Sequence, residues 1–151
     1  MDEPSAAVGI EPGFVGPQRI LLIHRWFWPD TPPYASMLRS IGRRLVADGH
    51  EVTVLTAQPS YSDASRSTKC PRLERLDGMT VHRVRLLPES KRNYLARGIN
   101  MLLFMFAVRR FILKRRGDRA FHRVMVSTMP PVLVAATVRR AAHRRGGRFF
   151  Y

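Results

Sequence analysis

Segment 24–36, HRWFWPDTPPYAS, combines a large aromatic surface with a stiff backbone. It holds both tryptophans of the chain, one phenylalanine, one tyrosine and three of the eleven prolines. Prolines lower the entropy that a loop loses when it orders around a ligand. The segment leaves an apolar run at 20–23 and enters an amphipathic pattern, so it joins a strand to a helix N-terminus, where phosphate is favoured. These features together predict a ligand site.

A second loop, 127–131, belongs to the same predicted site. It follows another apolar run and contains Pro130 and Pro131. In an open parallel sheet, ligands bind at the carboxyl ends of the strands, and two central strands bring their loops to one rim. The residues predicted to line this cleft are His24, Arg25, Trp26, Trp28, Asp30, Pro33, Tyr34, Ala35, Ser127, Thr128, Met129 and Pro130.

The aromatic residues also have a simpler interpretation, in which they cover the end of the hydrophobic core. For Trp26, Phe27 or Trp28 taken singly we favour this interpretation, and for the loop as a whole we favour a site. His24 is the one histidine at the end of a predicted strand, and the other four histidines and the lone Cys70 lack metal-ligand spacing. No metal is predicted. Neither G-x-G-x-x-G nor Walker A occurs, so a dinucleotide fingerprint and an ATP P-loop are unsupported.

A sheet of parallel strands must position these loops. Apolar runs and an Asp-Gly turn predict strands at 19–24, 51–56, 72–76, 79–85, 122–127 and 148–151. Helical patterns occupy 34–48, 94–116 and 130–146. The alternation of strand and helix predicts an α/β fold with a doubly wound, mostly parallel sheet.

The length of 151 residues suits one domain with a sizeable core. Residues 1–18 lack the basic start and apolar stretch of a signal peptide and are predicted to be a disordered tail. We assign 19–151 to a Rossmann-like domain. Because the sequence stops within a predicted strand, we expect this domain to be incomplete at its C-terminus.

Positive charge is concentrated in the second half of the chain. The net charge is +15, and residues 1–76 hold 9 basic and 8 acidic side chains, whereas residues 77–151 hold 17 and 3. Such a field attracts nucleic acid, anionic lipid headgroups or phosphorylated substrates, and its sign alone does not choose among them.

The helical stretch 94–116 is a second candidate site. Its apolar part is shorter than the about 20 residues that span a bilayer. Aromatic side chains between cationic clusters suit a helix that lies on anionic lipid, and the alternative is a core helix with a solvated cationic end. The charge of the second half favours a membrane surface, at Arg97, Phe104, Arg109, Arg110, Phe111, Lys114, Arg115 and Arg116.

Several segments in order resemble the N-terminal domain of family 4 glycosyltransferases, with the bacterial enzymes of surface-polysaccharide synthesis as the most similar subset. The segments are RILLIHRWFWPD (19–30), GHEVTVLTAQPSY (49–61), DGMTVHRV (77–84), VSTMPPVLVAA (126–136) and RGGRFFY (145–151). The resemblance implies one Rossmann-like half of a GT-B enzyme, usually retaining and metal-independent. It also implies that the loops 30–36 and 127–131 face the acceptor and the donor diphosphate.

The resemblance further implies a glycan or lipid-linked sugar acceptor, with Trp26, Trp28 and Tyr34 stacking on sugar or isoprenoid and Arg25 meeting phosphate. No tightly bound cofactor is expected, since the nucleotide-sugar is a co-substrate held mainly by a donor domain that this sequence lacks. We therefore expect the chain to be inactive in hexosyl transfer without such a domain or a separate donor-binding subunit. The expected location is cytoplasmic, at the inner face of the cell membrane.

Some residues depart from the family pattern. Thr31 to Ala35 replace the Gly-Gly pair of many relatives, and 127–131 contains no histidine. Two other hypotheses remain open, a basic nucleic-acid-binding α/β module and a non-functional fragment. No recognition-helix, RNP or zinc pattern accompanies the charge, so we predict no nucleic-acid partner.

Overall fold

The computed structural model describes residues 16–30, 32–60, 69–88, 94–115, 117–126, 132–144 and 148–150. One sheet forms the centre of an α/β domain. Its strands are β1 (Arg19–Ile23), β2 (Glu51–Ala57), β3 (Leu73–Leu76), β4 (Met79–Val84), β5 (Arg123–Val126) and β6 (Arg148–Phe150). The helices are α1 (Pro33–Ala47), α3 (Tyr94–Lys114) and α4 (Val132–His143), with a short 3-10 turn at Gly117–Arg119. The predicted class, strands and helices are confirmed.

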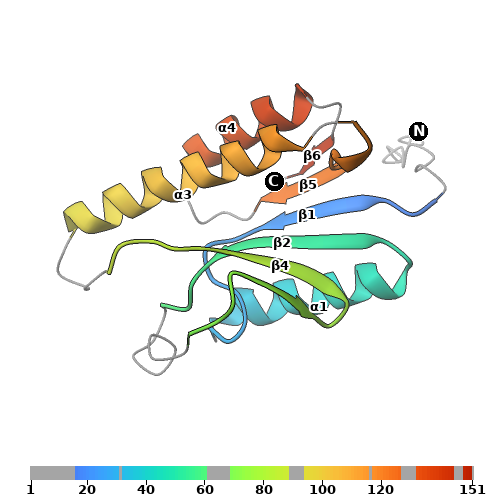
Figure 1. Ribbon diagram of the computed structural model, residues 1–151, viewed down its shortest axis with the longest axis horizontal. Helices are drawn as coiled ribbons and strands as arrows, with labels where there is room; N and C mark the ends of the chain where they lie inside the picture. The colour runs from blue at the N-terminus through green and yellow to red at the C-terminus, as the bar shows by residue number, and fades with distance from the viewer. Residues whose placement is uncertain are drawn as a thin grey trace, which may run out of the picture.

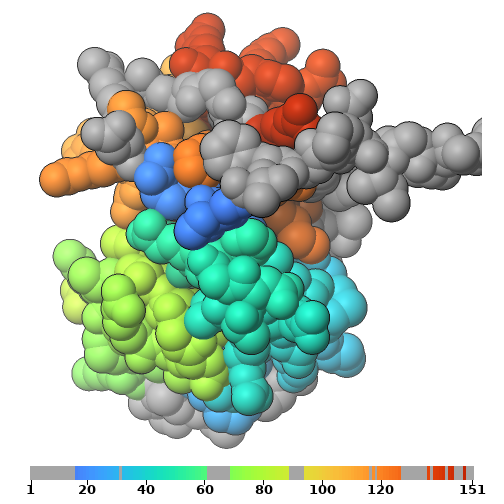
Figure 2. Space-filling model, turned by 90° about the vertical axis from the view of Figure 1, so that its right-hand side faces the viewer, coloured from blue at the N-terminus to red at the C-terminus, as the bar shows by residue number. Residues whose placement is uncertain are grey.

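The sheet is mostly parallel and is covered on both faces. Its six strands lie in the order β3-β4-β2-β1-β5-β6, and only the β3–β4 hairpin is antiparallel. Helices α3 and α4 cover one face and α1 covers the other (Figure 1). Figure 2 views the molecule from the side on which β1 begins and shows α4 in red above the sheet, with the hairpin and α1 below it. The doubly wound arrangement agrees with the prediction.

The core consists of two apolar clusters, one on each face of the sheet. Leu21 and Ile23 of β1 pack against Phe104, Val108 and Ile112 of α3. The alternate strand residues, Ile20 and Leu22, pack toward α1 in the second cluster. A parallel strand buried on both faces must be apolar throughout, which is why its sequence reads as an unbroken apolar run.

The register brings the predicted loops to one edge of the sheet. Ile23, the last residue of β1, pairs with Leu55 of β2 on one side and with Val126 of β5 on the other. The loops after β1 and β5 therefore leave neighbouring strands at the same edge, as the sequence predicted. Residues 127–130 lie outside the described residues, so the structure does not place Ser127, Thr128, Met129 or Pro130.

Helix α1 lies close against the sheet because Gly42 has no side chain. A Cβ atom at this position would overlap Sδ of Met79 in β4 and would contact Leu22 in β1. The helix ends where the sequence predicted, since Gly49 adopts a φ of +84° and donates its N–H to the carbonyl of Val46. The other end of the helix begins at Pro33, so its first turn directly follows the aromatic loop.

A buried amide attaches α3 to the chain that leaves β4. Asn100 is fully buried, and its Oδ1 accepts the Leu87 N–H at 2.9 Å while its Nδ2 donates to the Leu87 carbonyl at 3.0 Å. One side chain therefore satisfies both backbone groups of a residue in an irregular segment. Although α3 is mostly apolar, the polar contact between Asn100 and Leu87 positions its first turns.

We expect Asn100→Ala to lower the free energy of unfolding by about 1–3 kcal/mol, because it removes two hydrogen bonds, each of which contributes about 0.5–1.5 kcal/mol, at a fully buried position. Urea unfolding followed by circular dichroism measures the change. Arg110→Ala, on the exposed side of the same helix, is the control and should change stability by less than about 0.5 kcal/mol. Equal effects of the two substitutions would contradict this role for Asn100.

Most of the predicted N-terminal tail, residues 1–15, lies outside the described residues. Its last residue, Gln18, is buried, and its Oε1 accepts a hydrogen bond from Arg123 Nε at 2.5 Å. Its carbonyl accepts the Glu51 N–H. Gln18 therefore belongs to the domain that was predicted to start at residue 19.

Candidate functional site

The loop after β1 alternates buried anchors with exposed side chains. Phe27 is fully buried in the cluster beneath α1, whereas the neighbouring Trp28 is 42% exposed. Arg25 and Trp26 are half-buried, and the Arg25 guanidinium lies 5.5 Å from the centre of the Trp26 ring. The core interpretation is confirmed for Phe27, whereas Trp28 lies at the surface, where the ligand site stays a prediction.

His24 holds the start of the loop. It is 2% exposed, and its Nδ1 lies 3.2 Å from the Trp26 backbone nitrogen and 2.6 Å from the Trp26 carbonyl oxygen. Its ring packs on Tyr34 of α1 with centroids 4.6 Å apart. Burial lowers the pKa of His24, and the hydrogen bond to the Trp26 backbone opposes this effect only in part. The imidazole is therefore neutral at pH 7 and positions the loop.

Asp30 and Ala35 are buried as well, although both were predicted to line the cleft. Each is 1% exposed. The Asp30 carboxylate accepts the Ser60 N–H at 3.2 and 3.4 Å, which joins the loop after β1 to the loop after β2. The surface available to a ligand is formed instead by Trp26, Trp28 and Pro33, together with the half-buried Arg25 and Tyr34.

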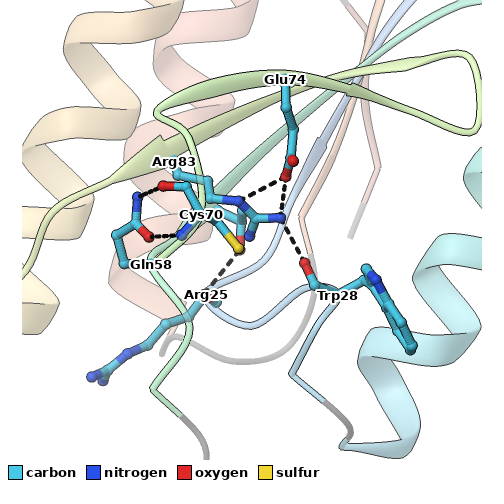
Figure 3. Close-up of polar contacts among 7 residues, drawn as sticks. Arg25, Trp28, Gln58, Cys70, Glu74 and Arg83 are labelled. Carbon is cyan, nitrogen blue, oxygen red and sulfur yellow. Dashed lines mark hydrogen bonds and ion pairs between the residues drawn. The ribbon is translucent and has the colours of Figure 1, made fainter. Parts of the chain in front are cut away.

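A buried arginine in β4 supports the loop from below. Arg83 donates from Nη2 to the Trp28 carbonyl at 2.6 Å, and its Nε and Nη2 both donate to Glu74 Oε1 of β3, at 3.0 and 2.5 Å (Figure 3). Its side chain is 1% exposed and that of Glu74 is 25% exposed. Among the described residues Nη1 has no hydrogen-bond partner. The backbone carbonyl of Trp28, the most exposed aromatic residue of this loop, is thus held by an arginine that is itself fixed in an ion pair.

Gln58 and Cys70 extend this support at the end of β2. The Gln58 amide donates to the Cys70 carbonyl at 3.0 Å and accepts the Cys70 N–H at 3.4 Å (Figure 3). Burial raises the pKa of the Cys70 thiol, and Arg83 opposes this effect only in part. Cys70 therefore stays a protonated thiol at pH 7 and is no activated nucleophile.

Sequence reasoning missed the support formed by Glu74, Arg83 and Gln58, although one signal for it was present. Met79, Val81 and Arg83 alternate along β4, and all three are buried. The two-residue period of a strand therefore places a charge on the apolar face. A buried charge requires a partner, and the hairpin makes Glu74 the nearest acidic candidate.

The Trp28 ring points away from this support and toward α1 (Figure 3). The guanidinium of Arg39 lies 4.4 Å from the ring centre, and Arg39 Nε is bound to Asp77 Oδ2 at 2.6 Å. The hydrogen bond from Arg39 lowers the pKa of Asp77. One surface of Trp28 is thus covered by a neutralised arginine while 42% of the residue stays open to a ligand.

The predicted membrane residues on α3 divide into two groups. Phe104 is 1% exposed and belongs to the core, so it does not reach a membrane surface, contrary to the prediction. Arg115 is half-buried over the Phe111 ring, 3.7 Å from its centre and 3.5 Å from His82 Nε2, so this pair packs against the sheet. Arg97, Arg109, Arg110 and Lys114 are exposed, and Arg116 lies outside the described residues.

Residues 34–150 match the glycosyl transferase 4-like domain. The chain belongs to this family. The matched range contains the whole sheet except β1, and the aromatic residues 24–33 precede it. Glycosyl transfer is therefore the general activity associated with this family.

Solved structures with the same fold have low sequence identity to the glycosyltransferase domain. Sucrose-phosphate synthase from Thermosynechococcus elongatus superposes with a TM-score of 0.58 at 14% identity, over 87% of this chain and 32% of that one. The C-terminal domain of a hydrogenase from Pyrococcus furiosus gives TM-scores of 0.53 and 0.55 in two structures, at 17% identity, over 88% of this chain and 89% of that domain. No curated protein sequence matches the chain. The chain spans about a third of the synthase.

Proposed function

We propose that this domain binds the acceptor in a retaining glycosyltransferase that uses a nucleotide-sugar donor. The observation that carries the proposal is the family match over residues 34–150, joined to an aromatic loop at the carboxyl edge of the sheet. Ligands of doubly wound sheets bind at this edge. Family membership supports glycosyl transfer in general, and the acceptor role rests on the chemistry of the loop.

The exposed residues of the loop suit a sugar that is linked to phosphate and lipid. Trp28 offers an open aromatic surface, and Trp26 and Tyr34 flank the buried His24. Aromatic faces stack on the apolar faces of sugars and on isoprenoid chains alike. Arg25 supplies the positive charge that a phosphate or diphosphate linkage requires.

Rigidity of the loop favours binding. Phe27 fixes it to the core, Asp30 joins it to Ser60, and Arg83 holds the Trp28 carbonyl. A loop that is ordered before the ligand arrives loses little entropy on binding. The proposed role of His24, Asp30 and Ala35 is therefore to hold the loop rather than to contact the acceptor.

Transfer also requires a donor-binding domain, which we propose to face this edge from the same polypeptide or from a second subunit. The comparison with sucrose-phosphate synthase supports this view, because the domain corresponds to 32% of that larger chain. The nucleotide-sugar then acts as a co-substrate held mainly outside the domain described here. No catalytic residue is assigned to the chain.

Tryptophan fluorescence tests the proposal directly, because both tryptophans of the protein lie in the loop. We expect a short-chain polyprenyl diphosphate that carries one sugar, presented in detergent micelles, to change the emission in a saturable way. Trp28→Ala, with Trp26 left as reporter, should weaken this binding about tenfold through the loss of stacking. Met37→Ala, another exposed apolar position, is the matched control and should leave the affinity unchanged.

UDP-glucose is the donor probe in the same assay. A much weaker response to UDP-glucose than to the lipid-linked sugar would support the acceptor role. The opposite order of affinities would contradict it, as would a Trp28→Ala variant with the affinity of the original protein.

A further inference from the structure

The outer side of α3 carries an uncovered apolar ridge. Phe104, Val108 and Ile112 face the core, and on the opposite side of the helix Leu95 is 76% exposed, Leu102 54% and Phe106 62%. Ile99 and Leu103 fill the ridge between them, at 39% and 41%. A helix that packs on a sheet with one side normally presents polar residues on the other. Adjacent exposed apolar side chains of this kind mark an interaction surface.

Cations surround the end of this ridge. Phe106 and Arg109 of α3 line a groove of about 340 Å³ together with Arg140 of α4 and Arg144, which directly follows that helix. A second groove, of about 460 Å³, lies beside it and is lined by Phe106, Arg109, Arg110, Leu113 and Lys114. The sequence indicated the cations of α3, and only the tertiary structure adds those of α4.

The arginines of this groove differ in their ion pairing from three arginines on the opposite face of the sheet. There Arg39, Arg44 and Arg83 are bound to Asp77, Asp48 and Glu74, respectively. Within the described part of the chain, Arg109, Arg140 and Arg144 form no ion pair, and all three are exposed. Their charge is thus available to an external anion.

We propose that the outer face of α3, with the last turn of α4, docks on a bilayer that contains anionic phospholipid. Helix α3 has 21 residues, so it can lie along the membrane for about 30 Å. The ridge from Leu95 to Phe106 enters the boundary between headgroups and acyl chains, and the arginines around the two grooves contact lipid phosphates. Apolar insertion combined with cations at the headgroup level is the pattern of interfacial helices.

In this proposal α3 lies on the surface of the membrane and does not cross it. None of the helices in the described residues has the length and apolarity that spanning a bilayer requires. The first turns of α3 extend past the sheet on the side where β1 ends (Figure 1). The inference stands independently of glycosyl transfer, since it rests on α3 and α4 alone.

Vesicle flotation of the full chain tests this surface at 150 mM salt. We expect binding to phosphatidylcholine vesicles that contain 30% phosphatidylglycerol, and little binding to phosphatidylcholine alone. The triple variant R109Q/R140Q/R144Q should lower the partition coefficient at least tenfold, because each basic residue near an anionic surface adds severalfold. Leu102→Ser with Phe106→Ser should weaken binding severalfold and should remove the part that survives 0.5 M salt.

The matched control is R43Q/R44Q/R75Q, which removes the same charge from exposed positions of α1 and the β3–β4 hairpin. It should bind within about twofold of the original protein, in contrast to the ~tenfold loss at the proposed surface. Equal losses in the two triple variants would overturn the proposal, because net charge alone would then explain binding.

Three other outcomes would also overturn it. The first is an absence of vesicle binding at 150 mM salt. The second is vesicle binding that the Leu102→Ser and Phe106→Ser changes leave intact. In the third, the protein does not bind vesicles but forms a stable dimer in light scattering or binds random DNA. R109Q/R140Q/R144Q then abolishes that dimer or that DNA binding. Circular dichroism of every variant confirms that these exposed substitutions leave the fold unchanged.

Discussion

Phe27→Ala is expected to lower the free energy of unfolding by about 3–5 kcal/mol, whereas Trp28→Ala should lower it by only about 1 kcal/mol. Phe27 is fully buried beside Leu38 and Met79, so its removal leaves a cavity in a packed cluster. Trp28 is 42% exposed and loses mainly its contact with the Arg39 guanidinium. Two neighbouring aromatic residues thus have opposite roles, one in stability and one at the surface.

Chemical unfolding of both variants measures this difference. Because a domain of this size is stable by about 5–15 kcal/mol, Phe27→Ala can lose a large part of its folded population. Phe27→Leu keeps most of the volume and should cost less than about 2 kcal/mol. Stability losses of similar size for Phe27→Ala and Trp28→Ala would show that the loop is not anchored as described.

Glu74→Gln is expected to lower the free energy of unfolding by about 2–4 kcal/mol. Removing one partner of a buried ion pair costs about 3–5 kcal/mol when the remaining charge stays buried. The Arg83 side chain is 1% exposed, but that of Glu74 is 25% exposed, so water reaches the carboxylate and the expected loss is smaller. The Trp28 carbonyl should then lose its fixed position, because Arg83 Nη2 contacts both groups.

A double-mutant cycle with Arg83→Met isolates this coupling. Arg83→Met removes the charge and replaces the aliphatic stem of the arginine, so we expect the double variant to be more stable than the sum of the two single losses by about 1–2 kcal/mol. Arg44→Gln, in the exposed i,i+4 pair with Asp48, is the control and should change stability by less than about 0.5 kcal/mol. Additive losses for Glu74 and Arg83 would contradict a coupled buried pair.

The aromatic loop shows which features of the candidate site the residue pattern could predict. Local periodicity placed the loop between a strand and a helix. Parallel-sheet geometry placed it beside the loop that follows the strand ending before residue 127. The individual fates of Phe27, Trp28 and Asp30 did not follow, since an irregular loop has no repeat that assigns each side chain to one face. The site was therefore predicted as a region, and among those of its residues that the structure describes only the outer ones remain accessible.

Helix α3 shows a different limit. Its sequence is apolar around much of its circumference, so periodicity distinguished the core side from the exposed side poorly. The prediction placed Phe104 and Arg115 at a surface, whereas packing against the sheet buried the first and half-buried the second. The exposed row of Leu102 and Phe106 became visible only once the sheet defined which side was covered.

The sequence by itself determined the order of strands and helices, the parallel sheet and the edge at which the loops after β1 and β5 leave it. These features depend on local periodicity, on turn residues and on the handedness of crossovers, all of which lie within short stretches of chain. Only the tertiary structure decided that Arg83 pairs with Glu74 beneath Trp28 and that α3 and α4 share one cationic groove. Such contacts join residues distant along the chain, and their strength depends on burial, which exists only after the sheet and its two helix layers have packed.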